Sequence, residues 1–265
     1  MKNKKRLDIL LTEKGMFPSR EKAKASIMAG LISVDGVMID KPGTEVSSES
    51  EITIKEKLIP YVSRGGLKLE KIINEHGLEL DGLTCMDIGA STGGFTDCML
   101  QNGAEKVYAV DVGYGQLDWK LRNDDRVENM EKVNIRYLDP ETITDDIDFI
   151  SIDVSFISLA LVFPVASALL GKEGKIAALI KPQFEAGREK VGKGGIVRDE
   201  NVHKEVIEKV LKLGEENGLS AEFLTYSPIK GAKGNVEYLV CFNNFGVNGD
   251  IDIDETVRKG NITLK

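Results

Sequence analysis

The chain has 265 residues, of which 42% are hydrophobic and 29% are charged, so it is long enough for one large domain or two smaller ones, each with its own core. No apolar run approaches the roughly 20 residues that span a bilayer. Asp8, Thr12 and Glu13 interrupt the stretch in which a signal peptide would have its apolar core. The sequence therefore predicts a cytoplasmic protein.

Cysteine and histidine are scarce. The three cysteines, Cys85, Cys98 and Cys241, lie far apart and form no Cys-x-x-Cys pair, and the two histidines do not cluster with them. We expect neither a disulfide framework nor a metal site.

The charge is unevenly distributed along the chain. The net charge is −8, yet the first 24 residues carry eight basic residues against three acidic ones. A basic region on an acidic protein indicates a local surface for a polyanion. The alternative is a solvated helix face, and the charge alone leaves both interpretations open.

The first segment has the pattern of a small module. Helical spacing of Leu7, Leu10 and Leu11 predicts one helix, and Ser19 begins a second that ends at Gly30. The second helix is expected to bury an apolar face, formed by Ala23, Ile27 and Met28. Asp35-Gly36 predicts a hairpin between two short strands, with a further strand at 52–54. We predict an α+β module over residues 1–57 and a linker over 58–63.

From residue 64 onward the pattern changes to alternating strands and helices. After a first helix that ends at His76-Gly77, the strand candidates are Thr84–Ile88, Lys106–Val110, Phe149–Asp153, Lys175–Leu179, Ala221–Tyr226 and Val236–Phe242. The helix candidates are Thr96–Asn102, Leu159–Leu170 and Asn201–Asn217. This order predicts an α/β domain over residues 64–245, with a doubly wound, mostly parallel sheet. Residues 246–265 have no clear pattern and stay unassigned.

A glycine-rich loop follows the first predicted strand of this sheet. Gly89, Gly93 and Gly94 allow the backbone to turn tightly and approach a ligand, and Asp111 ends the next strand. A structural turn is the simpler alternative. The spacing differs from a dinucleotide fingerprint, and Asp-x-Gly-x-x-x-Gly resembles the first motif of class I methyltransferases. This resemblance implies S-adenosylmethionine as cofactor, bound by Asp87, Gly89, Ala90, Ser91, Gly93, Gly94, Phe95 and Asp111. It implies that Asp87 lies near the methionine amino group and Asp111 on the ribose.

Four charged residues have distinctive positions. Lys68 lies just before the sheet domain, Asp153 and Lys181 end apolar strands, and Glu237 lies within the last strand candidate. Each alone could be a solvated residue or part of a structural salt bridge. Their order resembles the Lys-Asp-Lys-Glu tetrad of the FtsJ-like 2′-O-ribose methyltransferases. Three local motifs are similar to those of the TlyA family of ribosomal RNA methyltransferases, often labelled hemolysin-like: Ser63–Leu69, Asp87–Thr96 and Lys181–Glu185.

The resemblance extends to the first module, where Arg6-Leu7-Asp8, Ser19-Arg20, Ala23 and Gly30 are similar to an S4-like RNA-binding domain. It implies 2′-O-methylation of cytidine in ribosomal RNA, with Lys181 as base, Rossmann-like methyltransferase architecture, ribosomal subunits as partners and no metal. The candidate RNA contacts are Arg6, Ser19, Arg20, Lys22, Lys24, Lys41, Arg64 and Arg188. Arg188 belongs to a glycine-rich basic loop that is either a lid over the substrate or a disordered surface loop.

Three other functions compete with this interpretation. A membrane-active hemolysin is disfavoured by the lack of an apolar or amphipathic segment of useful length. An inactive RNA-binding or ribosome-assembly factor would not need the cofactor loop and all four charged residues. A pseudouridine synthase with the same first module would not need an S-adenosylmethionine loop. The modified nucleotide, the choice between one subunit and both, and the oligomeric state stay open.

Overall fold

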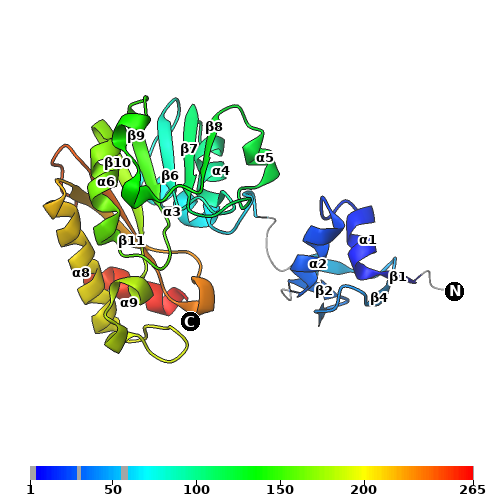
Figure 1. Ribbon diagram of the computed structural model, residues 1–265. Coiled ribbons are helices and arrows are strands. Elements are labelled where there is room, and N and C mark those ends of the chain that lie inside the picture. Colours follow the sequence, from blue (N-terminus) through cyan, green and yellow to red (C-terminus); the bar gives the residue numbers. More distant parts are fainter. Residues whose placement is uncertain (1–3, 29–30, 55–58, 265) are drawn as a thin grey trace. The chain divides into compact units, whose positions relative to one another are not determined.

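The structure is a computed structural model that describes residues 4–28, 31–54 and 59–264. The chain forms two compact units, Met1–Pro60 and Tyr61–Lys265, each with its own helices and strands (Figure 1). Three expectations fall outside the described residues: the helix end at Gly30, the module end at Lys57 and the first linker residue, Leu58.

The first unit packs two helices against short strands. Its elements are β1 (Lys4–Arg6), α1 (Leu7–Glu13), α2 (Arg20–Met28), β2 (Ile32–Val34), β3 (Val37–Ile39), β4 (Glu45–Ser47) and β5 (Ile52–Ile54). Strand β2 lies between β3 and β5, and β1 pairs with β4. Ala23 and Ile27 of α2 are buried as expected, but Met28 is 64% exposed. The expectation for Met28 was wrong, because one residue further along a helix lies about 100° away from the face that Ala23 and Ile27 share.

A buried carboxylate organises the first unit. Asp8 is fully buried and accepts hydrogen bonds from Arg6 (3.1 Å) and from Arg20 (2.9 Å), which joins the starts of α1 and α2. Its backbone N–H also donates to the carbonyl of Pro42. The hydrogen bond from Arg6, with further help from Arg20, outweighs the effect of burial and lowers the pKa of Asp8 to about 2.

The first prediction concerns this carboxylate. Because the pKa of Asp8 is lower in the folded protein, its ionised form stabilises the unit above about pH 4, and this contribution is lost as the pH falls through about 2. Asp8→Asn should destabilise the unit by about 1–2 kcal/mol at pH 7. Faster hydrogen exchange over residues 7–54 would report the loss. Asp40→Asn, at an exposed acid of the same unit, should leave exchange unchanged; equal exchange in both variants would contradict the prediction.

The larger unit is built on one seven-stranded sheet, with the strand order β11-β12-β10-β9-β6-β7-β8. The strands are β6 (Thr84–Ile88), β7 (Lys106–Asp111), β8 (Val127–Glu131), β9 (Ile147–Ile152), β10 (Leu170–Ile180), β11 (Ser220–Tyr226) and β12 (Tyr238–Asn243). The helices are α3 (Gly66–His76), α4 (Gly94–Gln101), α5 (Trp119–Arg122), α6 (Phe163–Leu169), α7 (Pro182–Glu185), α8 (Glu200–Glu216) and α9 (Ile253–Thr263). Strand β12 runs antiparallel to both neighbours, and the other pairs are parallel.

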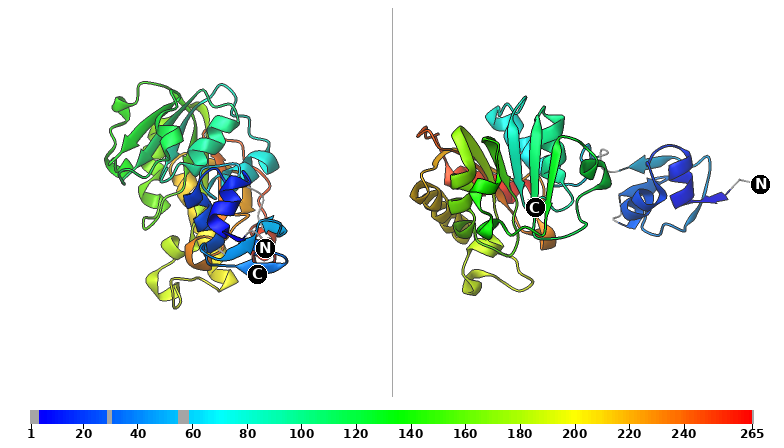
Figure 2. Two further views of the ribbon diagram at one scale, coloured as in Figure 1. Left: turned by 90° about the vertical axis from the view of Figure 1, so that its right-hand side faces the viewer. Right: turned by 45° about the horizontal axis from the view of Figure 1, so that its top comes forward.

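Both faces of this sheet are covered by helices (Figure 1, Figure 2), which explains the continuous apolar strands. Successive side chains of a strand point to opposite faces. On one face Ile150 and Ile176 join a cluster with Phe163 of α6 and Val206 of α8. On the other face Phe149 joins a cluster that includes residues of α3 and α4. The expected α/β architecture with helices on both faces is confirmed.

Several segments differ from the sequence prediction. Strand β8 had no strand candidate, and β12 begins at Tyr238, so Glu237 directly precedes the strand in which it was expected. The helix expected over Leu159–Leu170 begins only at Phe163, because Pro164 suits a first turn, and Leu170 already belongs to β10. Within the unassigned tail, Asp252 caps α9, whose Val257 is fully buried in the core. Among the described residues, no helix is both long enough and apolar enough to cross a membrane.

Candidate active site

The order of the strands in the sheet indicates where a ligand-binding site would lie. The chain continues from β6 to β7 and β8 on one side and then returns to the other side of β6 as β9. Ligands of such sheets bind where the order reverses, at the carboxyl ends of the strands. Here Gly89 follows β6 and Asp153 follows β9. Gly89 has φ +91°, and a Cβ atom there would lie 2.6 Å from the Asp153 carbonyl oxygen, so the two strand ends meet closely only because residue 89 is glycine.

Asp87 stabilises the loop from Gly89 to Phe95 from the interior side. This side chain is fully buried, and its carboxylate accepts hydrogen bonds from the Thr96 backbone N–H (2.9 Å) and hydroxyl (2.7 Å) and from Ser151 (3.2 Å). Burial raises the pKa of Asp87 to about 7. The carboxylate points beneath α4 and fixes the loop, because its partners lie in the sheet and at the helix start. Its place near the methionine amino group stays a prediction.

Asp111 supports the same loop from its other side. Its carboxylate accepts hydrogen bonds from the backbone N–H of Ser91 (2.8 Å) and of Gly113 (2.6 Å). The side chain is only half-buried, and each oxygen retains a further lone pair. Asp111 thus joins the glycine loop to the loop after β7 and keeps capacity to accept from a ligand hydroxyl.

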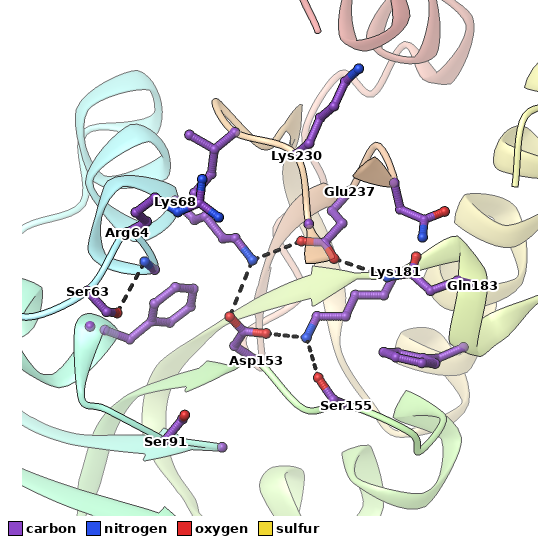
Figure 3. Close-up of a pocket in the computed structure, with 18 of the residues that line it drawn as sticks. Ser63, Arg64, Lys68, Ser91, Asp153, Ser155, Lys181, Gln183, Lys230 and Glu237 are labelled. Atoms are coloured by element: carbon purple, nitrogen blue, oxygen red, sulfur yellow. Dashed lines mark hydrogen bonds and ion pairs between the residues drawn. The ribbon is translucent and has the colours of Figure 1, made fainter. Parts of the chain in front are cut away.

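The four charged candidates, Lys68, Asp153, Lys181 and Glu237, converge next to this loop, although they come from separate segments (Figure 3). Lys68 of α3 donates to Glu237 (2.8 Å) and to Asp153 (3.5 Å). The Lys181 Nζ atom lies 2.5 Å from the other Asp153 oxygen. Asp153 therefore lies between two ammonium groups, with one carboxylate oxygen toward each.

The reversed direction of β12 brings Glu237 into the group. In the antiparallel pair, Ile180 at the end of β10 lies opposite Tyr238 at the start of β12. Lys181 and Glu237, the next residues outward on each strand, consequently reach the same edge of the sheet. Glu237 is 2% exposed and also accepts from the Gln183 amide (3.1 Å).

The charges within this group stabilise one another. Burial opposes ionisation of Asp153, but Lys68 and Lys181 outweigh it and lower the pKa of the carboxyl. Burial likewise opposes the charge of Lys68, yet Asp153 and Glu237 raise the pKa of this lysine overall. At neutral pH Asp153 is thus a carboxylate and Lys68 an ammonium.

A cavity of about 520 Å³ connects the glycine loop with the four charged residues. Its wall includes residues that the sequence analysis did not single out, namely Ser155, Phe156, Gln183, Phe184, Ile229, Lys230, Lys233 and Asn235. The Gln183 Oε1 atom is buried and has no hydrogen-bond partner among the described residues. Gln183 lies within the Lys-Pro-Gln-Phe-Glu motif, which was the only sequence signal for it. An unpaired acceptor at this wall suits a ligand hydroxyl.

The basic glycine-rich loop reaches the cavity through Gly195, and Asn235 holds it there. The Asn235 side chain is buried, donates to the Gly195 carbonyl (2.8 Å) and accepts from the Val197 N–H (3.0 Å). Arg188 comes before Gly195 in this loop, in a short 3-10 turn (η4, Arg188–Lys190), and is exposed.

The structure separates the other candidate RNA contacts into two kinds. Arg6 and Arg20 bind Asp8 and thereby stabilise the first unit, and Ser19 accepts from the Lys22 backbone N–H as a helix cap (3.3 Å). Lys22 and Lys41 are exposed, and Lys24 is half-buried. In the larger unit, Arg64 is exposed at the cavity wall.

Comparison with solved structures shows which class of fold the larger unit has. A solved structure from Listeria monocytogenes, whose title names an S-adenosylmethionine-dependent methyltransferase, is similar over 68% of this chain and 99% of that one, with a TM-score of 0.51 and 15% identity. A structure from Streptococcus thermophilus, whose title uses the name hemolysin, covers 100% of this chain and 98% of its own, with 46% identity and a TM-score of 0.80. The larger unit therefore has a methyltransferase fold.

Residues 61–244 match the FtsJ-like methyltransferases and residues 5–52 match the S4 domain, so the chain belongs to the FtsJ-like methyltransferase family and carries an S4 domain. It is 40% identical to the 16S/23S rRNA (cytidine-2′-O)-methyltransferase TlyA of Mycobacterium tuberculosis, over 91% of this chain and 90% of the relative. It is 43% identical to a Brachyspira hyodysenteriae protein named Hemolysin A, over 89% and 99%.

The close approach at Gly89 gives the second prediction. Gly89→Ala adds backbone strain at φ +91° and forces its Cβ toward the Asp153 carbonyl, so the melting temperature should fall by about 5 °C or more. Gly82→Ala is the matched control, because Gly82 also has a positive φ (+73°) but nothing within 4 Å of its Cβ position. Equal melting temperatures for the two variants would show that the contact has no energetic consequence.

Proposed function

We propose that the protein methylates ribose 2′-hydroxyls of ribosomal RNA, with S-adenosylmethionine as methyl donor and cytidine as the target nucleoside. The observation that carries this proposal is the convergence of Lys68, Asp153, Lys181 and Glu237 on one cavity beside the glycine loop. The name of the Mycobacterium tuberculosis relative, an rRNA (cytidine-2′-O)-methyltransferase, supports the same reaction and nucleoside.

The loop has features that suit the cofactor. Gly89, Ser91 and Gly94 line the cavity, and the two glycines allow a ligand to approach the main chain closely. Asp111 is the candidate acceptor for the ribose hydroxyls, through the lone pairs that Ser91 and Gly113 leave free. When bound, S-adenosylmethionine supplies an electrophilic methyl group on a sulfonium sulfur.

Lys181 is the proposed base. It is 8% exposed and lines the cavity, where its neutral amine can accept the proton of a 2′-hydroxyl. Lys68 remains an ammonium between Asp153 and Glu237, and its role is to hold both carboxylates in place. The site contributes chiefly by positioning the ribose oxygen about 3 Å from the methyl carbon, in line with the carbon–sulfur bond.

The first unit is proposed to hold the RNA. Lys22, Lys24 and Lys41 are candidates for phosphate contacts, which position RNA without reading its sequence. Arg64 and Arg188, in the larger unit, are proposed to contact the RNA near the cavity. Residues 1–57 are thus assigned as the RNA-binding module and residues 64–245 as the catalytic domain.

The third prediction tests the base. Lys181→Ala should lower the rate of methyl transfer to ribosomal subunits by about 10²-fold or more, since it removes the group that accepts the proton. Cofactor affinity, measured by calorimetry, should stay close to that of the unchanged protein. Lys212→Ala, at a lysine of α8 that is 75% exposed, should retain full activity.

Two outcomes would contradict these assignments. Full activity of Lys181→Ala would rule out Lys181 as the base. Failure of the unchanged protein to bind S-adenosylmethionine would favour an inactive RNA-binding or assembly factor.

The fourth prediction concerns RNA binding. Lys22→Ala combined with Lys24→Ala should weaken RNA binding and reduce the slope of log affinity against log salt by about 1–2, because each phosphate contact releases counterions. These lysines are preferable to Arg6 and Arg20 as test positions. Loss of either arginine would also remove a hydrogen-bond partner of the buried Asp8 carboxylate. Lys259→Ala on α9 is the control. Unchanged affinity after deletion of residues 1–57 would overturn the binding role of this unit.

A further inference from the structure

We propose that Ser155 is a positioning residue for Lys181, and that it fixes the direction in which the lysine amine presents its lone pair. This inference rests on the proposed function, in which Lys181 is the base. The observation behind it is a contact outside the four charged residues: Lys181 donates a hydrogen bond to the Ser155 hydroxyl at 3.0 Å (Figure 3).

Two acceptors lie around the Lys181 amine. Asp153 Oδ1 is 2.5 Å from Nζ and Ser155 Oγ is 3.0 Å from it. An ammonium has three N–H bonds in a tetrahedral arrangement, and the group rotates freely about its Cε–Nζ bond until acceptors hold it. One acceptor leaves two positions that are equivalent by rotation, whereas two acceptors leave a single third position.

The consequence matters when the amine is neutral. A neutral amine has two N–H bonds and one lone pair, and Asp153 and Ser155 together take both N–H bonds. The lone pair then occupies the third position. With Asp153 alone, the second N–H and the lone pair would exchange places. The lone pair would then point away from the reacting hydroxyl for part of the time. Ser155 thus raises the fraction of amines that are ready to accept a proton.

The loop that carries Ser155 is itself held in position. Glu185, which is buried in α7, accepts hydrogen bonds from the Ser158 hydroxyl and from the Leu159 N–H, both at 2.7 Å. Lys181 directly precedes α7. The base and the serine are therefore fixed relative to each other through one short stretch of structure.

Methyl transfer changes bonds at the ribose oxygen, at Lys181 and at the methyl donor, but not at Ser155. The ribose O–H bond breaks as an N–H bond forms on Lys181, and an oxygen–carbon bond forms to the methyl group. The electron pair of the broken carbon–sulfur bond stays on sulfur, which becomes a neutral thioether. Ser155 gains no bond and loses none. It is exposed, so its own hydroxyl hydrogen can donate to water while its oxygen accepts from Lys181.

The test compares variants of the full chain in single-turnover methylation of ribosomal subunits with labelled S-adenosylmethionine. Ser155→Ala should lower the rate constant about tenfold, because fewer of the Lys181 amines then present their lone pair to the hydroxyl. The KM for the subunits and the cofactor dissociation constant should stay within about twofold of the unchanged values. Ser155→Thr, which keeps the hydroxyl, should recover most of the rate, whereas Ser155→Cys keeps the size with a weaker acceptor and should resemble Ala.

The matched control is Ser167→Ala, which removes a hydrogen-bonded hydroxyl outside the cavity and should leave the rate unchanged. An unchanged rate in Ser155→Ala, or an Ala-like rate in Ser155→Thr, would overturn the role of Ser155. Loss of cofactor binding in Ser155→Ala would also overturn it, since the serine would then support the fold. Lys181→Ala separates the two proposals: its inactivity beside a fully active Ser155→Ala rejects only the serine's role, and its full activity rejects the base itself.

Discussion

Two nearly buried lysine side chains in one cavity need a shared carboxylate, and Asp153 provides it. Removing a lysine charge from water costs several kcal/mol unless a partner compensates. Asp153 gives one oxygen to each lysine, and Glu237 gives Lys68 a second carboxylate. The group therefore places two lysine side chains beside two carboxyl groups. Its members depend on one another, because loss of either carboxylate would leave a lysine charge uncompensated.

The place of Asp153 depends in turn on the backbone around it. The Asp153 N–H donates to the Ile88 carbonyl, and the Asp153 carbonyl lies against Gly89. These two residues end β6 and begin the glycine loop, which Asp87 and Asp111 support by accepting backbone N–H groups. One junction between β6 and β9 consequently determines where the glycine loop lies and where the charged residues lie.

Much of this arrangement could be predicted from the sequence, because it follows from local patterns. Apolar runs with charged ends placed Asp153 and Lys181 at strand ends, and the glycine spacing located the loop. Side-chain direction was harder to predict. Asp87 has the motif position of a ligand-binding residue, yet its carboxylate points into the interior toward Thr96 and Ser151.

The contact of Ser155 with Lys181 also could not be predicted, since serine is common in loops and the contact depends on how the loop folds back over 26 residues of sequence separation. In the first unit, the sequence analysis predicted Arg6 and Arg20 as RNA contacts and did not connect them with a buried partner. Their shared partner, Asp8, became evident only from the packing of α1 against α2.

The position of β12 within the sheet has a consequence for synthesis of the chain. Strand β11 precedes β12 in sequence but lies beyond it in the sheet, so β11 has no neighbour to pair with until β12 has been inserted next to β10. A nascent chain that ends before residue 237 would contain Lys68, Asp153 and Lys181 but lack the second carboxylate. Such an intermediate lacks one carboxylate partner of Lys68 and has an open sheet edge in the place where the site will form. Completion of the sheet and of the group of four charged residues thus both depend on the insertion of β12.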